Sequence, residues 1–310
     1  MSEASGNKTF LHELELGIGT WAWGDRLMWG FGSTYNAQDV RQAFDASIAA
    51  GITLFDTAEI YGQGKSEQLL GEFLKTTDQK LLIATKFLPY PWRLGRRTLT
   101  RALRGSLKRL GVAQVDLYQI HQPIPPVTPE TWMAALADAV QAGITREVGV
   151  SNYDRSWMQR SYDALAREGL ALASNQVEYS LINRRVEKNG LLKQCQELGV
   201  RLIAYSPLGM GLLTGKYTPD NPPAGMRAGR YNRRFIERIA PLITLIKRIG
   251  SDHGGKTPSQ VALNWVICKG ALPIPGAKNY AQAEQNAGAL GWRLTEAEVA
   301  ALDAASDRLS

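Results

Sequence analysis

Metal-ligating and disulfide-forming residues are scarce in this sequence. It has 2 cysteines and 3 histidines among 310 residues, and His12, His121 and His253 lie far apart along the chain. Two cysteines cannot form a disulfide scaffold or a cysteine-rich zinc site, and no two histidines have the spacing of a helical ligand pair. We therefore expect no catalytic metal, and a protein of a reducing compartment.

Long apolar runs are also missing. The longest fall well short of the roughly 18 residues that a membrane span needs, and the first ten residues contain no apolar signal core. Hydrophobic residues make up 44% of the chain and charged residues 21%, which excludes intrinsic disorder and is ordinary for a protein with a buried core. We expect a cytoplasmic globular protein with no membrane partner.

The charge balance is basic, with 36 Lys and Arg against 29 Asp and Glu and a net charge of +7. One cluster of the excess consists of Arg227, Arg230, Arg233, Arg234 and Arg238. The other includes a stripe with helical spacing, formed by Arg97, Arg101, Arg104 and Lys108. A solvated helix face explains this stripe, and an acidic partner or a phosphate-bearing ligand is the alternative. No nucleic-acid-binding motif accompanies either cluster, so no nucleic-acid partner is expected.

Eight short β-rich apolar runs recur along the chain, at residues 14–19, 52–56, 81–86, 115–121, 147–151, 173–178, 200–206 and 271–275. Helical patterns fill the gaps, at residues 39–50, 129–142, 154–168, 189–198, 235–253, 257–268 and 280–288. A cap residue followed by proline, Thr128-Pro129 and Thr257-Pro258, predicts the start of two of these helices. Most runs are continuously hydrophobic, which is typical of parallel strands buried on both faces. The pattern predicts one domain over residues 1–310 with an α/β fold, a (β/α)₈ TIM barrel. An open, doubly wound sheet is the competing architecture.

The connection between the seventh and eighth runs is unusually long. It begins with a Gly-, Pro- and Arg-rich stretch at residues 209–234. Loops of this length in a compact domain are usually functional, so we expect a lid or a binding loop after strand seven.

Charged and polar side chains end consecutive runs. Asp56 ends the second run, with Tyr61 soon after it, Lys86 ends the third, and His121 ends the fourth. In a (β/α)₈ barrel these ends meet on the face that carries the active site. A lysine at a strand edge can simply extend its ammonium to solvent, but the three ends together predict a catalytic cluster.

The chemistry of this cluster can be derived from its side chains. Tyr61 is a phenol with a reference pKa near 10, and an ammonium about 4 Å away would lower that pKa by up to about 3 units. Asp56 would keep Lys86 charged, and His121 could bond the oxygen that Tyr61 serves. The group predicts proton donation to a carbonyl oxygen, with a second reactant supplying the electrons.

Several of these strand-end residues, and others like them, belong to longer motifs. They are Asp56-Thr-Ala-Glu-Ile-Tyr-Gly, Gly149-Val-Ser-Asn, Gln176-Val-Glu-Tyr-Ser and Ala204-Tyr-Ser-Pro-Leu-Gly. With these motifs, Lys86 and His121, the chain from Leu14 to about Leu302 resembles the aldo-keto reductase superfamily. Within it, the chain looks most like the bacterial and plastid reductases near the potassium-channel β-subunit branch, a group that includes pyridoxal reductase-like proteins. The resemblance implies a barrel that binds a nicotinamide cofactor without a dinucleotide-binding domain. It also implies that Asp56, Tyr61, Lys86 and His121 are the catalytic tetrad, with Tyr61 as general acid.

The same resemblance assigns the cofactor contacts. Ser151, Asn152 and Gln176 match the residues that grip the carboxamide, and Tyr205 matches the aromatic residue under the nicotinamide. The loop along the pyrophosphate matches Ser206, Pro207, Leu208, Gly209, Leu213, Gly215 and Lys216. The segment around the adenosine and its 2′-phosphate matches Gly276, Ala277, Lys278, Gln282, Gln285 and Asn286. The expected cofactor contacts also include Gly19, Thr20 and Trp21 at the end of the first strand, and Asp56 at the end of the second.

The expected cofactor is NADPH, although one motif departs from the family pattern. Many members have Ile-Pro-Lys-Ser after strand eight and an arginine further on, whereas this chain has Ile274-Pro-Gly-Ala-Lys278 and Gln282. Lys278 could supply the missing cation, and residues 272–283 contain no acidic side chain to repel a 2′-phosphate.

The expected substrate is a small aldehyde or ketone. Trp21, Trp23, Trp92 and Gln122 are the predicted pocket residues, and the loop aromatics favour an apolar substrate. Two other functions stay open. One is a cofactor-binding sensor or β-subunit-like module with slow turnover, and the other is a Schiff-base lyase that uses Lys86.

Overall fold

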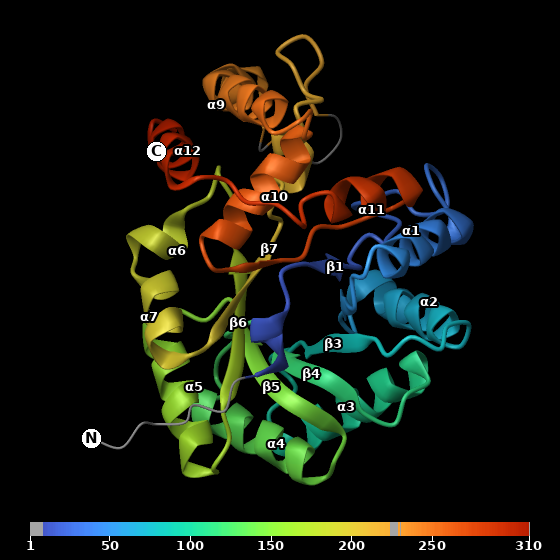
Figure 1. The fold of residues 1–310 in the computed structure, drawn as a ribbon. Helices are drawn as coiled ribbons and strands as arrows, with labels where there is room; N and C mark the ends of the chain where they lie inside the picture. The colour runs from blue at the N-terminus through green and yellow to red at the C-terminus, as the bar shows by residue number, and fades with distance from the viewer. Residues whose placement is uncertain (1–8, 224–228, 230, 310) are drawn as a thin grey trace.

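The computed structural model describes residues 9–223, 229 and 231–309. Its centre is one eight-stranded sheet in which each strand pairs in parallel with the next along the chain (Figure 1). The strands are β1 Gly17–Gly19, β2 Leu54–Asp56, β3 Leu82–Phe87, β4 Val115–Ile120, β5 Thr145–Ser151, β6 Leu172–Glu178, β7 Arg201–Tyr205 and β8 Leu272–Pro273. This order confirms the predicted (β/α)₈ barrel, and the open, doubly wound alternative is wrong.

Helices surround the strands (Figure 1). They are α1 Ala37–Ala49, α2 Lys65–Leu74, α3 Arg96–Leu110, α4 Pro129–Gln141, α5 Arg155–Arg167, α6 Arg185–Lys188, α7 Leu191–Leu198, α9 Arg233–Asp252, α10 Pro258–Cys268, α11 Tyr280–Ala287 and α12 Glu296–Asp307. Three 3₁₀ helices accompany them, η1 Phe10–Glu13, η2 Tyr61–Gly64 and η3 Gly209–Thr214. The cap-then-proline starts predicted at Thr128 and Thr257 are present, and each threonine side chain accepts a backbone N–H.

The first and last strands close the barrel through a very short contact. Gly19 N donates to Pro275 O at 3.0 Å, and Gly19 forms a parallel bridge with Gly276. A Cβ on Gly19 would lie 2.8 Å from Ile274 O, so a side chain here would push the two strands apart. Closure therefore depends on glycine at the end of β1.

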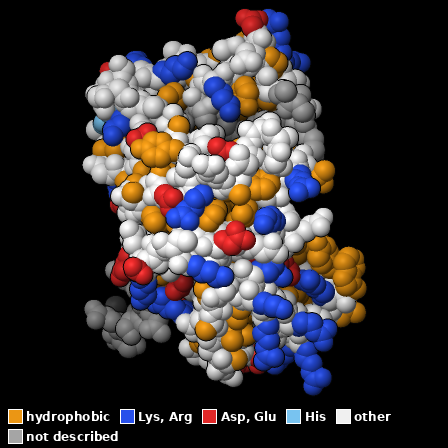
Figure 2. Space-filling model, turned by 90° about the vertical axis from the view of Figure 1, so that its right-hand side faces the viewer, with side chains coloured by type: hydrophobic (Ala, Val, Ile, Leu, Met, Phe, Trp, Pro, Cys, Tyr) orange, Lys and Arg blue, Asp and Glu red, His pale blue; other side chains and the backbone are white. Residues whose placement is uncertain are grey.

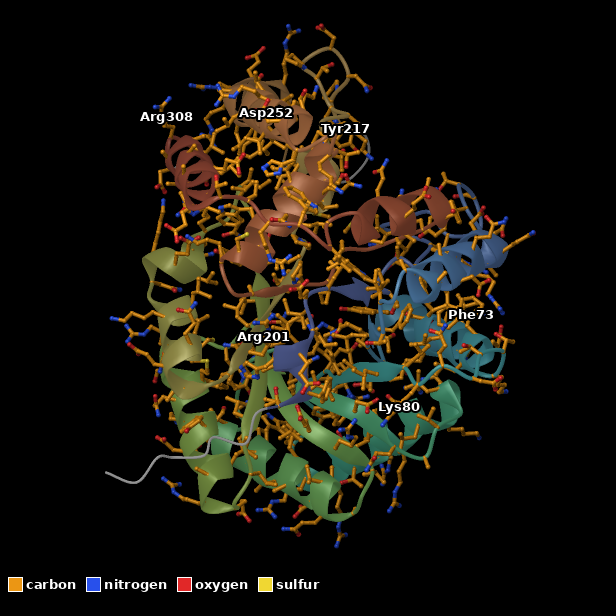
Figure 3. All side chains as sticks on the ribbon, viewed as in Figure 1. Phe73, Lys80, Arg201, Tyr217, Asp252 and Arg308 are labelled. Carbon is orange, nitrogen blue, oxygen red and sulfur yellow. The ribbon has the colours of Figure 1, made fainter. Side chains whose placement is uncertain are left out.

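The amino-terminal end of the barrel is plugged by η1. Leu11 is fully buried there, in an apolar cluster with Leu54, Ala84, Leu117, Ala173, Ile203, Leu272 and Ile274. Arg201, labelled near the centre of this end in Figure 3, donates to Leu14 O at 3.0 Å and ties β7 to the segment after the plug. The plug leaves the opposite end of the barrel for chemistry.

Candidate active site

The carboxyl ends of the strands surround one cavity of 740 Å³. Asp56 ends β2, Tyr61 begins η2, and His121 directly follows β4, and all three line this cavity. Lys86, in β3, is fully buried just behind them. The structure thus brings the predicted tetrad together.

Hydrogen bonds join three members of the tetrad, Asp56, Lys86 and Tyr61. Lys86 Nζ forms an ion pair with Asp56 Oδ1, donates to Thr57 O at 2.8 Å and reaches the Tyr61 hydroxyl at 3.3 Å. The Asp56 side chain is only 3% exposed, so water screens this pair poorly. The ammonium is fixed against the phenol by the barrel itself.

Burial changes the acid–base properties of this group. It raises the pKa of Tyr61, the Lys86 charge lowers it, and the net direction is upward. For Lys86, burial lowers the pKa, but Asp56 raises it further and the ammonium stays charged. The expected net fall in the Tyr61 pKa is therefore wrong for this state, because desolvation of the phenol outweighs the ammonium's attraction.

His121 is held neutral beside the phenol. Burial and the Lys86 charge lower the pKa of His121 to about 3. Its Nδ1 is buried and has no hydrogen-bond partner among the described residues, and its ring stands edge-on to Tyr61 with centroids 5.7 Å apart. A neutral imidazole can donate one hydrogen bond without adding charge.

A second network covers the ends of β5, β6 and β7. Ser151 Oγ donates to Gln176 O at 2.8 Å, and Asn152 Nδ2 donates to His121 O at 3.2 Å. The Tyr205 hydroxyl donates to Asn152 Oδ1 at 3.0 Å. Asn152 has a φ of +62°, a left-handed conformation that asparagine tolerates better than most residues. These contacts fix amide and aromatic groups beside the tetrad.

The cavity is also lined by residues at the start of α11. Asn279 caps this helix by accepting from Gln282 N, and Gln282 Oε1 accepts from Lys278 N at 3.0 Å. The Lys278 ammonium lies 4.5 Å from the Trp29 ring centroid and 4.8 Å from that of Tyr35. This part of the cavity presents a cation and a helix N-terminus, both favourable for an anion.

Residues 15–307 match the model of the aldo/keto reductase family. The chain belongs to the aldo/keto reductase family. The pyridoxal reductase of Arabidopsis thaliana, named chloroplastic, is 40% identical over 304 residues, which are 94% of this chain and 82% of that protein. The family confirms the predicted resemblance and makes the protein an oxidoreductase.

Solved structures of aldo-keto reductases superpose on the same fold. A glycerol dehydrogenase from Gluconobacter oxydans has a TM-score of 0.82 and 28% identity, with 95% of this chain and 91% of that chain covered. An aldo-keto reductase from Klebsiella pneumoniae, crystallised with NADPH, has a TM-score of 0.71 and 29% identity, with 94% and 90% covered.

Most residues assigned to the cofactor by family resemblance line the cavity. They are Gly19, Trp21, Asp56, Ser151, Asn152, Gln176, Tyr205, Ser206, Leu208, Lys216, Gly276, Lys278, Gln282, Gln285 and Asn286. Six others are not among the lining residues, namely Thr20, Pro207, Gly209, Leu213, Gly215 and Ala277. Thr20 shows why, because its hydroxyl is buried between Asp56 O and Ser66. It supports the site from behind.

Two of the four expected substrate-pocket residues do not reach the cavity of this reductase. Trp23 is fully buried, donates from Nε1 to Ala277 O at 2.8 Å, and packs with its ring centroid 5.7 Å from that of Phe73, which Figure 3 labels in α2. Trp92 is 73% exposed and stacks on Tyr90. Trp21 and Gln122 do line the cavity.

Several lining residues were not predicted, and they include Ile60, Met210, Thr214 and Ser259. Met210 and Thr214 lie in η3, and Ser259 lies in the first turn of α10. None of the four residues ends a strand, so the strand-end pattern that located the tetrad gives no signal for them.

The basic stripe lies away from the active site. Arg97, Arg101, Arg104 and Lys108 are exposed on α3 and none of them lines the cavity. Figure 2, which faces the side carrying α1 to α3, shows basic side chains gathered in its lower part. Neither the structure nor the comparisons support an acidic partner here. In the second cluster, Arg227 and Arg230 lie outside the described residues.

No helix in the described part of the chain is long and apolar enough to cross a membrane. Within the same residues, no group of three or more His, Cys, Asp or Glu side chains has the arrangement of a metal site.

Proposed function

We propose that this protein reduces small aldehydes and ketones to alcohols with NADPH, and that Tyr61 is the proton donor. The observation that carries the proposal is the buried relay in which Asp56 holds Lys86 and Lys86 meets the Tyr61 hydroxyl at 3.3 Å. A Schiff-base role for Lys86 is disfavoured, because its ammonium is paired, buried and charged.

The residues divide the work of the reduction among them. Bound NADPH supplies the hydride. Tyr61 donates its proton to the substrate oxygen as negative charge develops there, and Lys86 stabilises the phenolate that is left. Neutral His121 donates a hydrogen bond to the same oxygen and orients the carbonyl. Asp56 keeps the positive charge on Lys86.

The shape of the cavity fits an extended dinucleotide. Its 740 Å³ is lined by Tyr61, by Tyr205 at the end of β7 and by Lys278 before α11. His121 Nδ1 is a buried polar atom that has no partner within the described part of the chain. At Gly276 a Cβ would meet only Gly19 O, 3.7 Å away, so the wall there is open to a bound group.

A flat aromatic aldehyde fits the substrate end best. Trp21 stacks beside Tyr61, with ring centroids 6.2 Å apart, and Trp29 meets Trp21 edge-on at 5.5 Å. Aromatic walls of this kind favour offset stacking on a planar ring. Because a relative is named a pyridoxal reductase, pyridoxal belongs in the test panel beside benzaldehyde and an aliphatic aldehyde.

The test of the proposed function is NADPH oxidation with this panel, in the wild type and in Tyr61→Phe. We expect Tyr61→Phe to lose about 10²- to 10⁴-fold in kcat, as is typical of a general acid, and to keep its NADPH affinity. A variant retaining more than about a tenth of wild-type turnover would refute the assignment, once rapid kinetics exclude rate-limiting release of the oxidised cofactor. Wild-type turnover slower than cofactor release with every aldehyde would favour the sensor function.

Lys278 is the proposed source of the preference for NADPH over NADH. A 2′-phosphate carries nearly two negative charges, and one charge-assisted contact of roughly 1.5–3 kcal/mol gives a preference of about 10- to 100-fold. The measurement is the Kd of each cofactor in the wild type and in Lys278→Ala. An unchanged ratio in Lys278→Ala would assign the preference to another group.

A further inference from the structure

A polar layer crosses the barrel interior directly behind the active site. Lys86, Gln119, Gly149 and Ser174 are successive register partners on β3, β4, β5 and β6. Register partners on neighbouring strands point to the same face, and Lys86 points inward to Asp56. Barrel interiors are usually filled with branched apolar side chains, so this layer requires a reason.

Gln119 connects this layer to the proton relay. It is fully buried, and its Nε2 donates to Asp56 Oδ2 at 3.3 Å. Gln176 Nε2 donates to the same oxygen at 2.9 Å, while the other oxygen, Oδ1, pairs with Lys86. The carboxylate is therefore held on both oxygens, and Gln119 is one of its two amide donors.

Ser174 holds Gln119 from the other side of β5. Its hydroxyl donates to Gln119 Oε1 at 3.3 Å and passes over Gly149, which stands between the two residues in the register. A Cβ on Gly149 would lie 2.2 Å from Ser174 Oγ and 3.3 Å from Gln119 Cγ. The backbone at Gly149 is not in the left-handed region, so space, and not conformation, requires glycine here.

We propose that Gln119 is a positioning residue of the proton relay, anchored by Ser174 across the gap that Gly149 leaves. The inference rests on the proposed function. Without Gln119 the Asp56 carboxylate loses one of its two amide donors and holds Lys86 less firmly. The ammonium then stabilises the Tyr61 phenolate less, and Tyr61 becomes a poorer acid.

The direct test is Gln119→Met, which keeps the volume and removes the hydrogen bonds of Gln119 with Asp56, Ser174 and Gln176. The charged or titratable groups around Tyr61 are Asp56 from β2, Lys86 from β3 and His121 after β4. We expect kcat to fall about 10- to 100-fold, the effect of one buried bond to a charged group. The alkaline limb of the rate profile should move to higher pH, while KM and the NADPH Kd change little, because Gln119 does not line the cavity. A kcat within about twofold of wild type and an unmoved limb would overturn the proposal.

Asn175→Leu is the matched control. Asn175 is also a fully buried amide in β6, but its Nδ2 donates to Tyr153 O at 3.0 Å, away from the relay. This change should lower stability and leave the pH profile in place. A similar shift in both variants would show a general structural effect and would count against Gln119.

Ultraviolet titration of the Tyr61 phenol, taken as the difference between each protein and its Tyr61→Phe form, needs no turnover. We expect the phenol to ionise at higher pH in Gln119→Met than in the wild type, and equal titrations would refute the inference. If the wild type reduces no aldehyde while this shift is present, the proposed function fails and the positioning role stands.

The anchor across Gly149 is tested by a double-mutant cycle on stability. Gly149→Ala should be strongly destabilising alone, because its Cβ overlaps Ser174 Oγ. In Ser174→Ala the nearest remaining atom is Ser174 O, 3.1 Å away, so the same alanine should cost much less there. Additive effects of the two changes would contradict the anchor.

Discussion

The surroundings of His121 set the charge state of its imidazole ring. Burial and the Lys86 ammonium both act against its imidazolium form, and its pKa is lowered to about 3. Across neutral pH the ring therefore stays uncharged. It can serve the substrate oxygen as a hydrogen-bond donor without competing with Tyr61 for the role of acid.

This pKa predicts a loss of stability in mild acid. The unfolded chain binds a proton on His121 near pH 6.5 and the folded chain near pH 3, so stability falls as pH drops through this window. Relative to His121→Gln, the wild type should lose about 1.4 kcal/mol between pH 7.5 and 5.5. Urea unfolding of both proteins at each pH gives the difference, and parallel pH dependence would contradict it.

The sequence predicts residues well where a strand end fixes them. Asp56, Lys86 and His121 were found because each ends an apolar run. Trp23 and Trp92 were misplaced because a loop tryptophan has no such reference. Trp23 turns into the core, where its ring packs against Phe55 in β2 and Phe73 in α2. Trp92 stacks on Tyr90 outside the cavity.

At the scale of elements, α2 and α3 pack so closely that replacing a helical glycine by alanine should destabilise the protein at one position, although this replacement usually stabilises a helix. A Cβ on Gly71 in α2 would lie 2.6 Å from the carbonyl oxygens of both Arg109 and Leu110. A Cβ on Gly105 in α3 would meet only the guanidinium of Arg109, at 3.3 Å, and no backbone. Both glycines are in regular helix, so only their neighbours differ.

The two alanine variants should therefore change stability in opposite directions. Gly71→Ala should lower the free energy of unfolding by about 1–3 kcal/mol, because backbone cannot move aside cheaply. Gly105→Ala should raise it by up to about 1 kcal/mol, the ordinary gain of alanine over glycine in a helix. Denaturant unfolding of both variants measures these changes. Equal changes in the free energy of unfolding would contradict a close contact between Gly71 and the backbone of α3.

Element prediction succeeded where periodicity and caps agree. Thr128-Pro129 and Thr257-Pro258 correctly predicted the starts of α4 and α10. In contrast, α2 and α12 were not among the expected helices. In α2 the first residues, Lys65 and Ser66, follow the glycine-rich turn Gly62–Gly64, which looks like a loop. The Ser66 hydroxyl is in fact buried against Thr20 and Thr57, a contact between distant segments that no local pattern reveals.

At the scale of the whole molecule, the candidate active site and the apolar plug that stabilises the barrel lie at opposite ends of the strands. The cavity and the tetrad occupy the carboxyl ends of the strands, and η1 closes the amino ends. The order of eight apolar runs was enough to predict this division, because parallel strands all point the same way. The plug itself was not predicted, since four residues without periodicity carry no signal of their own.

Leu11 tests the division directly. Its side chain is fully buried at the plugged end and is not among the cavity-lining residues. Leu11→Ala should lower the free energy of unfolding by about 2–5 kcal/mol, the cost of a buried leucine truncation. At 25 °C, kcat, KM and cofactor affinity should stay as in the wild type, because the cavity wall is unchanged. Leu27→Ala is the control, since Leu27 is 94% exposed and its loss should change stability by less than about 0.5 kcal/mol. A Leu11→Ala protein that keeps its stability but loses turnover would show that the plug is coupled to the active site through the barrel interior.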